Sequence, residues 1–301
     1  MTDSHGPHQT MTLPDGRTFE YLVEGDPDGY PLVHHHGTPG ASVPFPKYAD
    51  AARERGLALI QYTRAGYGGS TERPGRSVAD VTDDVTALLD HLGHDDFVTV
   101  GWSGGGPHSL ACAARLPGRC RAAVTGAGVA PYHAEGLDFL DGMGPENHAE
   151  FGAALDGPDQ LVPYLEKEAA SLTSVTADHI ADALGGLVSD VDKAYATGEH
   201  AERTLKVFRR AVENGVAGWR DDDLAFTKPW GFALNDITVP VSVWQGAQDR
   251  MVPFAHGKWL AAHVPGATVH LDEDMGHLSL WARIGEILDD LTTTIRLRYT
   301  G

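Results

Sequence analysis

One serine of the chain stands in a turn that carries almost no other side chains. The stretch VTVGWSGGGPHSL, residues 98–110, begins as a β-branched strand, breaks at GWSGG (101–105) and continues into a segment that opens on Pro107. Proline fits the first turn of a helix, because the N–H groups there have no partner within the helix. Gly-x-Ser-x-Gly between a strand and a helix is typical of a nucleophile elbow, a strained turn that exposes its serine. The pattern therefore predicts that Ser103 is a nucleophile.

Two other interpretations of this turn fit the residues less well. Glycines also form plain flexible connections between a strand and a helix. A phosphate-binding loop requires Gly-x-Gly-x-x-Gly, but Ser109 stands where the third glycine would follow Gly104 and Gly106, and no Gly-Lys-Ser/Thr ending is present. The strand before the turn and the helix expected after it favour the nucleophile.

A serine hydroxyl is a poor nucleophile until a base accepts its proton, and that base needs a carboxylate to orient it. VSVWQGAQDRMVP places Asp249 just past a later strand, and ATVHLDEDMGHLSL places His277 after the last strand. The chain has 16 histidines, of which His270 lies within the last strand pattern itself, and residues 272–274 form an acidic turn of the kind that is usually solvated. We predict that His277 is the base and that Asp249 orients it.

A second glycine-rich turn, HHHGTPG at residues 34–40, follows an early strand. Its Thr38 N–H could lie beside the Gly104 N–H, and two such donors would form an oxyanion hole. Alternate residues of a strand share a face, so two of the three histidines could bind a metal ion. The spacing implies no third ligand, and we predict neither a metal nor a cofactor.

Short apolar runs alternate with amphipathic segments along most of the chain. Strands are expected at residues 17–25, 30–37, 57–63, 96–101, 120–128, 239–246 and 267–273, and helices at 46–56, 77–93 (with Ser77 as N-cap), 108–116, 254–264 and 279–295. Such alternation predicts an α/β fold with a mostly parallel sheet covered by helices on both faces.

The alternation is interrupted once, at residues 131–229, where strand patterns disappear and acidic, helix-like sequence takes their place. This segment holds nineteen Asp and Glu residues against eight Lys and Arg. We predict a helical insertion above the carboxyl edge of the sheet, where open α/β sheets bind their ligands. The core domain would then comprise residues 11–130 and 230–301, after a loose tail at 1–10.

Length, charge and cysteine content narrow the class of protein. A chain of 301 residues suits one large domain with an insertion. Its net charge of −19 would repel nucleic acid and anionic membranes. Cys112 and Cys120 are too few for a disulfide framework. No signal peptide and no run of about 18 apolar residues is present, so we expect a cytoplasmic protein whose partner is a small-molecule substrate. No oligomeric state is predicted.

Together these motifs resemble the α/β-hydrolase fold superfamily from about Gly16 to the carboxyl terminus, outside the insertion. The matching stretches are HGTPG, RAGYGGS (64–70), GWSGG, GAQDRMVP and the late Gly-His. The resemblance implies an α/β-hydrolase fold whose inserted helices form a cap. It also implies the following roles: Ser103 as nucleophile, His277 as base, Asp249 as its orienter, Thr38 and Gly104 as backbone oxyanion donors, and His36 and Gly37 as supports of the oxyanion loop.

The resemblance implies a serine hydrolase that forms an acyl-enzyme, and we expect it to cleave a carboxylic ester of a small molecule. Two departures are visible. Thr63, Arg64 and Ala65 replace the Asp-Arg-Pro-Gly or Asp-x-Arg-Gly of many relatives, which affects loop support. Proline iminopeptidases usually carry His-Gly-Gly-Pro-Gly, where this chain has Thr38. An aminopeptidase of that kind stays open, as does a ligand receptor on the same fold. Ser103 in place of aspartate argues against an epoxide hydrolase or a dehalogenase.

Overall fold

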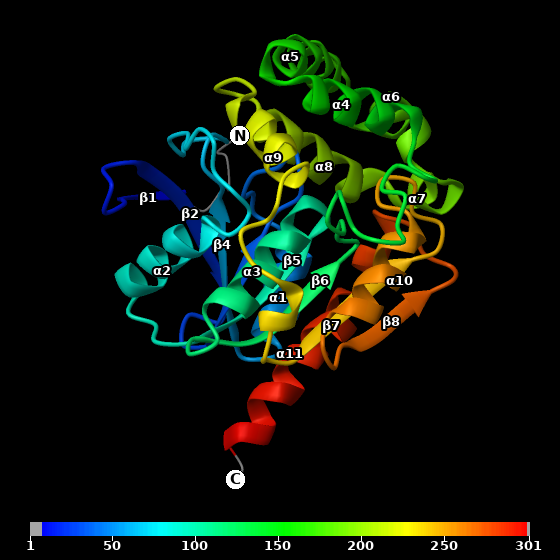
Figure 1. Cartoon of the computed structure of the whole chain (residues 1–301). Coiled ribbons are helices and arrows are strands. Elements are labelled where there is room, and N and C mark those ends of the chain that lie inside the picture. The colour runs from blue at the N-terminus through cyan, green and yellow to red at the C-terminus, as the bar shows by residue number, and fades with distance from the viewer. Residues whose placement is uncertain (1–7, 300–301) are drawn as a thin grey trace.

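A single eight-stranded sheet forms the centre of the computed structural model, which describes residues 8–299, the last six by their backbone alone (Figure 1). The strands lie in the order β1-β2-β4-β3-β5-β6-β7-β8. β1 pairs with β2 and β2 with β4 antiparallel, and every later pair is parallel. Their bounds are β1 Gln9–Thr12, β2 Thr18–Gly25, β3 Tyr30–His35, β4 Leu57–Thr63, β5 Phe97–Trp102, β6 Cys120–Gly126, β7 Val241–Gly246 and β8 Thr268–Asp272.

The register of the parallel strands brings their carboxyl ends to one level. His35 at the end of β3 pairs with Gly101 of β5, and Gly246 at the end of β7 pairs with Asp272 of β8. The loops that follow these strands therefore begin side by side at one edge of the sheet. This is the edge at which open α/β sheets bind ligands.

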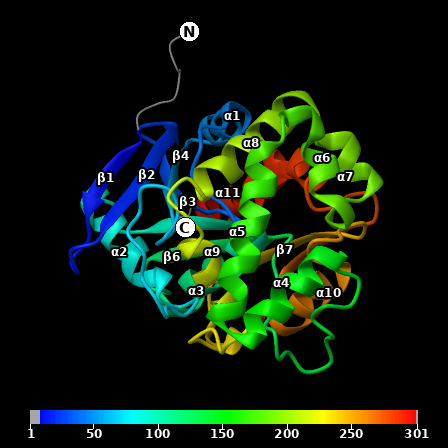
Figure 2. The same cartoon turned by 90° about the horizontal axis from the view of Figure 1, so that it is seen from above.

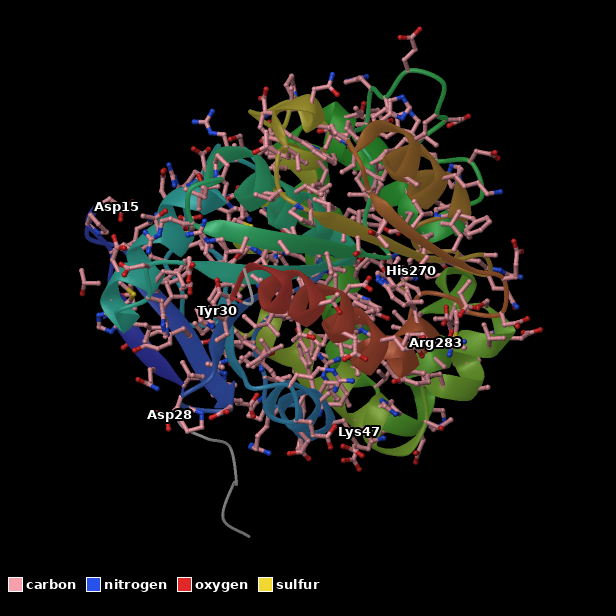
Figure 3. The ribbon with its side chains drawn as sticks, turned by 90° about the horizontal axis from the view of Figure 1, so that it is seen from below. Asp15, Asp28, Tyr30, Lys47, His270 and Arg283 are labelled. Carbon is pink, nitrogen blue, oxygen red and sulfur yellow. The ribbon has the colours of Figure 1, made fainter. Side chains whose placement is uncertain are left out.

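Five helices cover the two faces of the sheet, as the alternating pattern predicts. α2 (Val81–Leu92), α3 (Gly106–Arg115) and α10 (Phe254–His263) bury apolar side chains against one face, and α1 (Pro46–Arg53) and α11 (Ile284–Tyr299) against the other. Figure 3 views the molecule from the side opposite the inserted helices, with α11 in front of the strands. The fold is the expected α/β class with a mostly parallel sheet.

Helices fill the chain between β6 and β7, where the sequence shows no strand pattern. They are α4 (Pro145–Asp156), α5 (Pro158–Ser174), α6 (Ile180–Ala183), α7 (Asp190–Tyr195), α8 (Gly198–Ala211) and α9 (Ala217–Phe226). They lie above the carboxyl edge of the sheet (Figures 1 and 2). Leu161 and Leu165 of α5 pack with Leu205 of α8 in a separate apolar cluster. We call this segment the cap; its limits at 131 and 229 stay a prediction.

Two local expectations are wrong. Ser77 does not cap the second helix, which begins at Val81 after Asp80; the Ser77 N–H and hydroxyl instead donate to the Asp80 carboxylate, at 2.6 and 2.9 Å. Residues 9 and 10 of the predicted tail lie in β1, because they pair with Tyr21 and Glu20 of β2. His8 of that tail is also described, with its Nε2 2.9 Å from the Ser42 carbonyl oxygen, whereas residues 1–7 lie outside the described part of the chain. Within the described part, no helix is long and apolar enough to cross a membrane.

Candidate active site

The turn after β5 holds Ser103 in a conformation that side chains rarely adopt. Its φ is 56°, in the left-handed region, where a residue other than glycine costs about 1–3 kcal/mol. The flanking glycines permit close backbone approach. A Cβ on Gly101 would lie 2.8 Å from the Cβ of Ser109, and one on Gly105 would overlap the His35 carbonyl. Ser103 thus stands at the tip of a tight strand-to-helix turn, between β5 and α3.

Asp249 and His277 meet after β7 and β8. The Asp249 Oδ2 lies 2.8 Å from His277 Nδ1 and accepts a hydrogen bond from the Gln245 amide at 2.9 Å. The other oxygen, Oδ1, accepts from the backbone N–H groups of Met251 and Val252, both at 2.8 Å. Each carboxylate oxygen therefore takes part in two hydrogen bonds, and the carboxylate is held in one orientation. This arrangement places the Nδ1 proton toward Asp249 and leaves Nε2 free to act as a base.

The charge balance around His277 favours its protonated form. Burial alone would lower the pKa of His277, but the carboxylate of Asp249 outweighs burial and raises the pKa above its usual 6.5. Ser103 and His277 line the same pocket. Among the described residues, the Ser103 hydroxyl has no hydrogen-bond partner, His277 included. Hydrogen bonds between a nucleophile and its base are often long or poorly aligned in the absence of substrate and shorten when the substrate binds.

A cap residue that the sequence analysis did not identify holds the loop of His277. The Asp192 carboxylate, on α7, accepts hydrogen bonds from three consecutive backbone N–H groups, those of His277, Leu278 and Ser279, at 2.8–2.9 Å. The Ser279 hydroxyl donates to it as well, at 2.9 Å. Asp192 is fully buried. An acidic residue on a short helix, 85 positions before its partner, carries no local pattern that reveals this role.

The loop after β3 lies against the serine turn, as the pairing of β3 with β5 requires. A Cβ on Gly37 would be 3.3 Å from the Cβ of Ser103, and one on Gly104 would overlap the Thr38 hydroxyl. Among the described residues, the backbone N–H groups of Thr38 and Gly104 have no hydrogen-bond acceptor. Two unpaired donors from neighbouring loops are therefore available to an oxyanion beside the serine.

His36 and Arg64 support the Thr38 loop through hydrogen bonds to its backbone. The Arg64 N–H donates to His36 Nε2 at 2.9 Å, and His36 Nδ1 lies 2.8 Å from the Gly37 carbonyl. The Arg64 guanidinium donates to the carbonyls of His36 and Gly37, at 2.5 and 2.9 Å. The chain lacks the common Asp-Arg-Pro-Gly pattern at this position, but Arg64 nevertheless supports the loop through these hydrogen bonds.

A buried aspartate of the cap completes this support. The Asp222 carboxylate, on α9, pairs with Arg64 at 2.6 Å and Arg76 at 2.7 Å and accepts the hydroxyls of Thr38 at 2.6 Å and Tyr67 at 2.8 Å. Burial alone would raise the pKa of Asp222, but the two arginines outweigh it and hold the pKa well below its usual range. The sequence analysis did not identify Asp222, because it stands within a plain acidic run.

The pocket above Ser103 encloses about 190 Å³ between the sheet edge and the cap. Its cap wall carries the carboxyl groups of Glu150 and Asp223. Burial raises the pKa of Glu150 to about 7, while the Trp219 indole N–H donates to it at 2.8 Å. Burial and the nearby Glu150 raise the pKa of Asp223 well above its usual value. The two carboxyl groups lie close enough to share a hydrogen bond, and among the described residues Asp223 has no other hydrogen-bond partner.

Other histidines considered from the sequence serve packing. His270 stacks on Trp244, with ring centroids 3.9 Å apart, and pairs with Asp290 at 3.0 Å (Figure 3). Burial lowers the pKa of His34 to about 3, and it packs edge-on against Tyr48. The described residues include no group of three or more His, Cys, Asp or Glu side chains that could hold a metal ion.

Comparison with known proteins agrees with this architecture. Residues 30–283 match the sequence profile of the alpha/beta hydrolase fold family. A probable proline iminopeptidase of Leptolyngbya boryana is 33% identical over 95% of this chain and 94% of its own. A bifunctional esterase/perhydrolase of Acinetobacter calcoaceticus is 26% identical over 81% and 83%. The crystal structure of an esterase from Rhodococcus sp. ECU1013 superposes with a TM-score of 0.65 at 20% identity, over 95% and 98%.

The family match covers most of the chain, and the superposition on the solved esterase structure covers 95% of it. The chain therefore belongs to the alpha/beta hydrolase fold family and is a hydrolase of that fold. The relatives differ in what they act on, so the bond that this chain cleaves has to be inferred from its own pocket.

Proposed function

We propose that the protein is a serine hydrolase that cleaves the carboxylic ester of a small molecule, with Ser103 as nucleophile. One observation carries the proposal. Ser103, at positive φ, lines the same pocket as His277, whose Nδ1 lies 2.8 Å from Asp249 Oδ2. The Acinetobacter relative named an esterase supports the ester as the substrate class. A cavity of about 190 Å³ suits a small molecule.

In the proposed reaction, the Ser103 Oγ attacks the ester carbonyl while His277 Nε2 takes the hydroxyl proton. Asp249 stabilises the imidazolium that forms, and the N–H groups of Thr38 and Gly104 donate to the oxyanion. Collapse of the tetrahedral intermediate breaks the ester bond, and the imidazolium gives its proton to the leaving alkoxide. Water then attacks the acyl-enzyme with His277 again as base, which releases the acid and restores the serine.

The test is covalent labelling together with turnover of aryl esters such as 4-nitrophenyl acetate. The Ser103→Ala variant should lose labelling by a fluorophosphonate probe, and its kcat should fall by about 10⁴-fold or more. Ser174→Ala, an exposed serine of the cap, is the matched control and should match the unmodified protein. Labelling that persists in Ser103→Ala would place the nucleophile elsewhere and refute the proposal.

A second candidate is an aminopeptidase, favoured by the carboxyl groups of Glu150 and Asp223 on the cap wall. A substrate amine bound there would favour the charged forms of two carboxyl groups whose pKa values are raised mainly by burial. The Leptolyngbya relative named a probable proline iminopeptidase supports this alternative. Prolyl arylamides turned over faster than aryl esters, with the amide activity lost in Asp223→Asn, would favour the aminopeptidase over the esterase. Ligand binding without turnover of either would favour a receptor.

A further inference from the structure

Arg203 of the cap helix α8 lines the pocket without an ionic partner of its own. Its guanidinium lies over the rings of Phe45 and Trp281, with the central carbon 4.1 and 5.0 Å from their centroids. Its Nε is shielded from solvent and has no hydrogen-bond partner. Within the described part of the chain, no carboxylate forms an ion pair with Arg203 and no acceptor bonds to it. Figure 2 shows α8 between α1 and α5, above α11.

The charge of Arg203 persists at neutral pH. Burial lowers its pKa to about 10, which still leaves the guanidinium protonated. Tyr195, Tyr48 and Glu24 act to raise its pKa, and Glu24 accepts a hydrogen bond from the Gln61 amide at 2.8 Å. The charge of Arg203 in turn helps to lower the pKa of His34 and of His200. The carboxyl groups of the opposite cap wall do not act on it.

Two arginines that are more deeply buried than the half-buried Arg203 show which interaction its guanidinium lacks. Arg64 and Arg76 both pair with Asp222, at 2.6 and 2.7 Å. Buried charges in proteins are paired or bind a ligand, because an uncompensated charge costs several kcal/mol. Stacking on aromatic rings returns only about 0.5–2 kcal/mol. The stacking therefore fixes the position of the Arg203 guanidinium but does not compensate its charge.

Arg203 lies close to the candidate nucleophile along a chain of stacked rings. Trp281, on which the guanidinium lies, stacks on Trp102 with centroids 4.2 Å apart, and Trp102 directly precedes Ser103. All four residues line the same pocket. Among the described residues of that lining, Arg203 is the only arginine or lysine. The planar fork of donors can bind a carboxylate or a phosphate in a bidentate manner. One guanidinium neutralises the single charge of a carboxylate but would leave one charge of a phosphate dianion uncompensated in this lining.

We propose that Arg203 binds a carboxylate of the substrate, so that the preferred ester carries a free carboxylate on its acyl or its alcohol part. This inference rests on the proposed ester hydrolysis, which it deepens by naming the charge of the substrate. The guanidinium binds the carboxylate and holds the scissile carbonyl over Ser103.

Two matched pairs of esters test the proposal. On the acyl side, 4-nitrophenyl hydrogen glutarate is compared with 4-nitrophenyl pentanoate; on the alcohol side, 4-acetoxybenzoate is compared with 4-methylphenyl acetate. We expect the unmodified protein to prefer the charged member of at least one pair by about tenfold or more in kcat/KM. In Arg203→Met, which keeps a long stem without charge, this preference should fall at least about tenfold, mainly through KM. Lys206→Met, an exposed cation on the same helix, should retain it.

A binding arm separates this inference from the proposed function. Quenching of tryptophan fluorescence reports binding of the glutarate ester to Ser103→Ala, with and without Arg203→Met, and thermal unfolding checks that each variant is folded. Binding that depends on Arg203, without turnover by the unmodified protein, would refute the hydrolase proposal and uphold the carboxylate site. Equal turnover of charged and neutral esters, unchanged in Arg203→Met, would overturn the carboxylate site and leave the esterase standing. Arg203→Lys, which keeps the charge but not the fork, should retain part of the preference.

Discussion

At the scale of single residues, the Asp249 carboxylate decides how His277 can act. It accepts four hydrogen bonds, from His277, the Gln245 amide and two backbone N–H groups. A carboxylate held so tightly fixes the imidazole ring and the tautomer in which Nε2 is the base. It also raises the pKa of His277 against the opposing effect of burial. Orientation and basicity therefore come from the same side chain.

The pH profile of Asp249→Asn tests both effects. In the proposed mechanism the neutral imidazole is the base, so kcat/KM should rise with pH as His277 loses its proton, with the apparent pKa of this rise above 6.5 in the unmodified protein. Without the negative charge, burial dominates; the apparent pKa should fall, and kcat should drop by about 10⁴-fold. Ester hydrolysis measured from pH 5 to 9 gives both values. An acid limb at the same pH in both proteins would show that Asp249 does not act on the titrating group.

At the scale of elements, the loop between β8 and α11 is held by the cap. Asp192 of α7 accepts three consecutive backbone N–H groups and one hydroxyl from this loop. A Cβ on Gly276 would come within 2.6 Å of the carboxylate carbon, so the loop and α7 are in close contact. The Asp192 side chain of the short helix α7 therefore positions His277, the proposed base, by binding the backbone of the loop that carries it.

Asp192→Asn should misplace His277 and, because the Asp192 charge also helps to raise the pKa of His277, should lower that pKa by less than the loss of Asp249 does. The amide keeps the size of the side chain but replaces one acceptor oxygen with a donor that faces backbone N–H groups. We expect kcat/KM for aryl esters to fall by about 10- to 100-fold, because small displacements of a catalytic group have effects of that size. The apparent pKa of the acid limb should move by less than in Asp249→Asn. Asp190→Asn, at the exposed start of the same helix, is the control and should leave both quantities unchanged.

The difference between Asp249 and Asp192 shows which elements a sequence can reveal. Strand ends carry local signals, and the superfamily resemblance added a chain order for the groups expected after them. The sheet and the contact between Asp249 and His277 could therefore be anticipated, whereas the triad with Ser103 stays a prediction. Asp192 and Asp222 stand on cap helices, and their partners lie 85 and 158 positions away in the chain. No periodicity encodes such long-range contacts. Arg203 stayed hidden for the same reason, since only the packing of the cap reveals that it lacks a partner.

At the scale of the whole molecule, the cap and the core are joined by a buried ionic cluster beside the oxyanion loop. Asp222 of the cap meets Arg64 and Arg76 of the core, and all three side chains are at most 5% exposed. The same carboxylate accepts the Thr38 hydroxyl at 2.6 Å. Seating of the cap and the shape of the oxyanion loop are thus linked through one side chain.

Asp222→Asn should weaken both the attachment of the cap to the core and the support of the proposed oxyanion loop. Removing the negative charge leaves two buried guanidinium groups uncompensated. Because the loss of one partner of a buried ion pair costs about 3–5 kcal/mol, we expect the free energy of unfolding to fall by about that amount. Urea unfolding at pH 7 measures this loss, with Glu202→Gln, an exposed carboxylate of α8, expected within about 0.5 kcal/mol of the unmodified protein. Under conditions where Asp222→Asn is still folded, kcat for aryl esters should also fall, because Thr38 and Arg64 lose a shared anchor. A variant that lost stability but kept its full kcat would show that the cluster holds the cap without shaping the oxyanion loop.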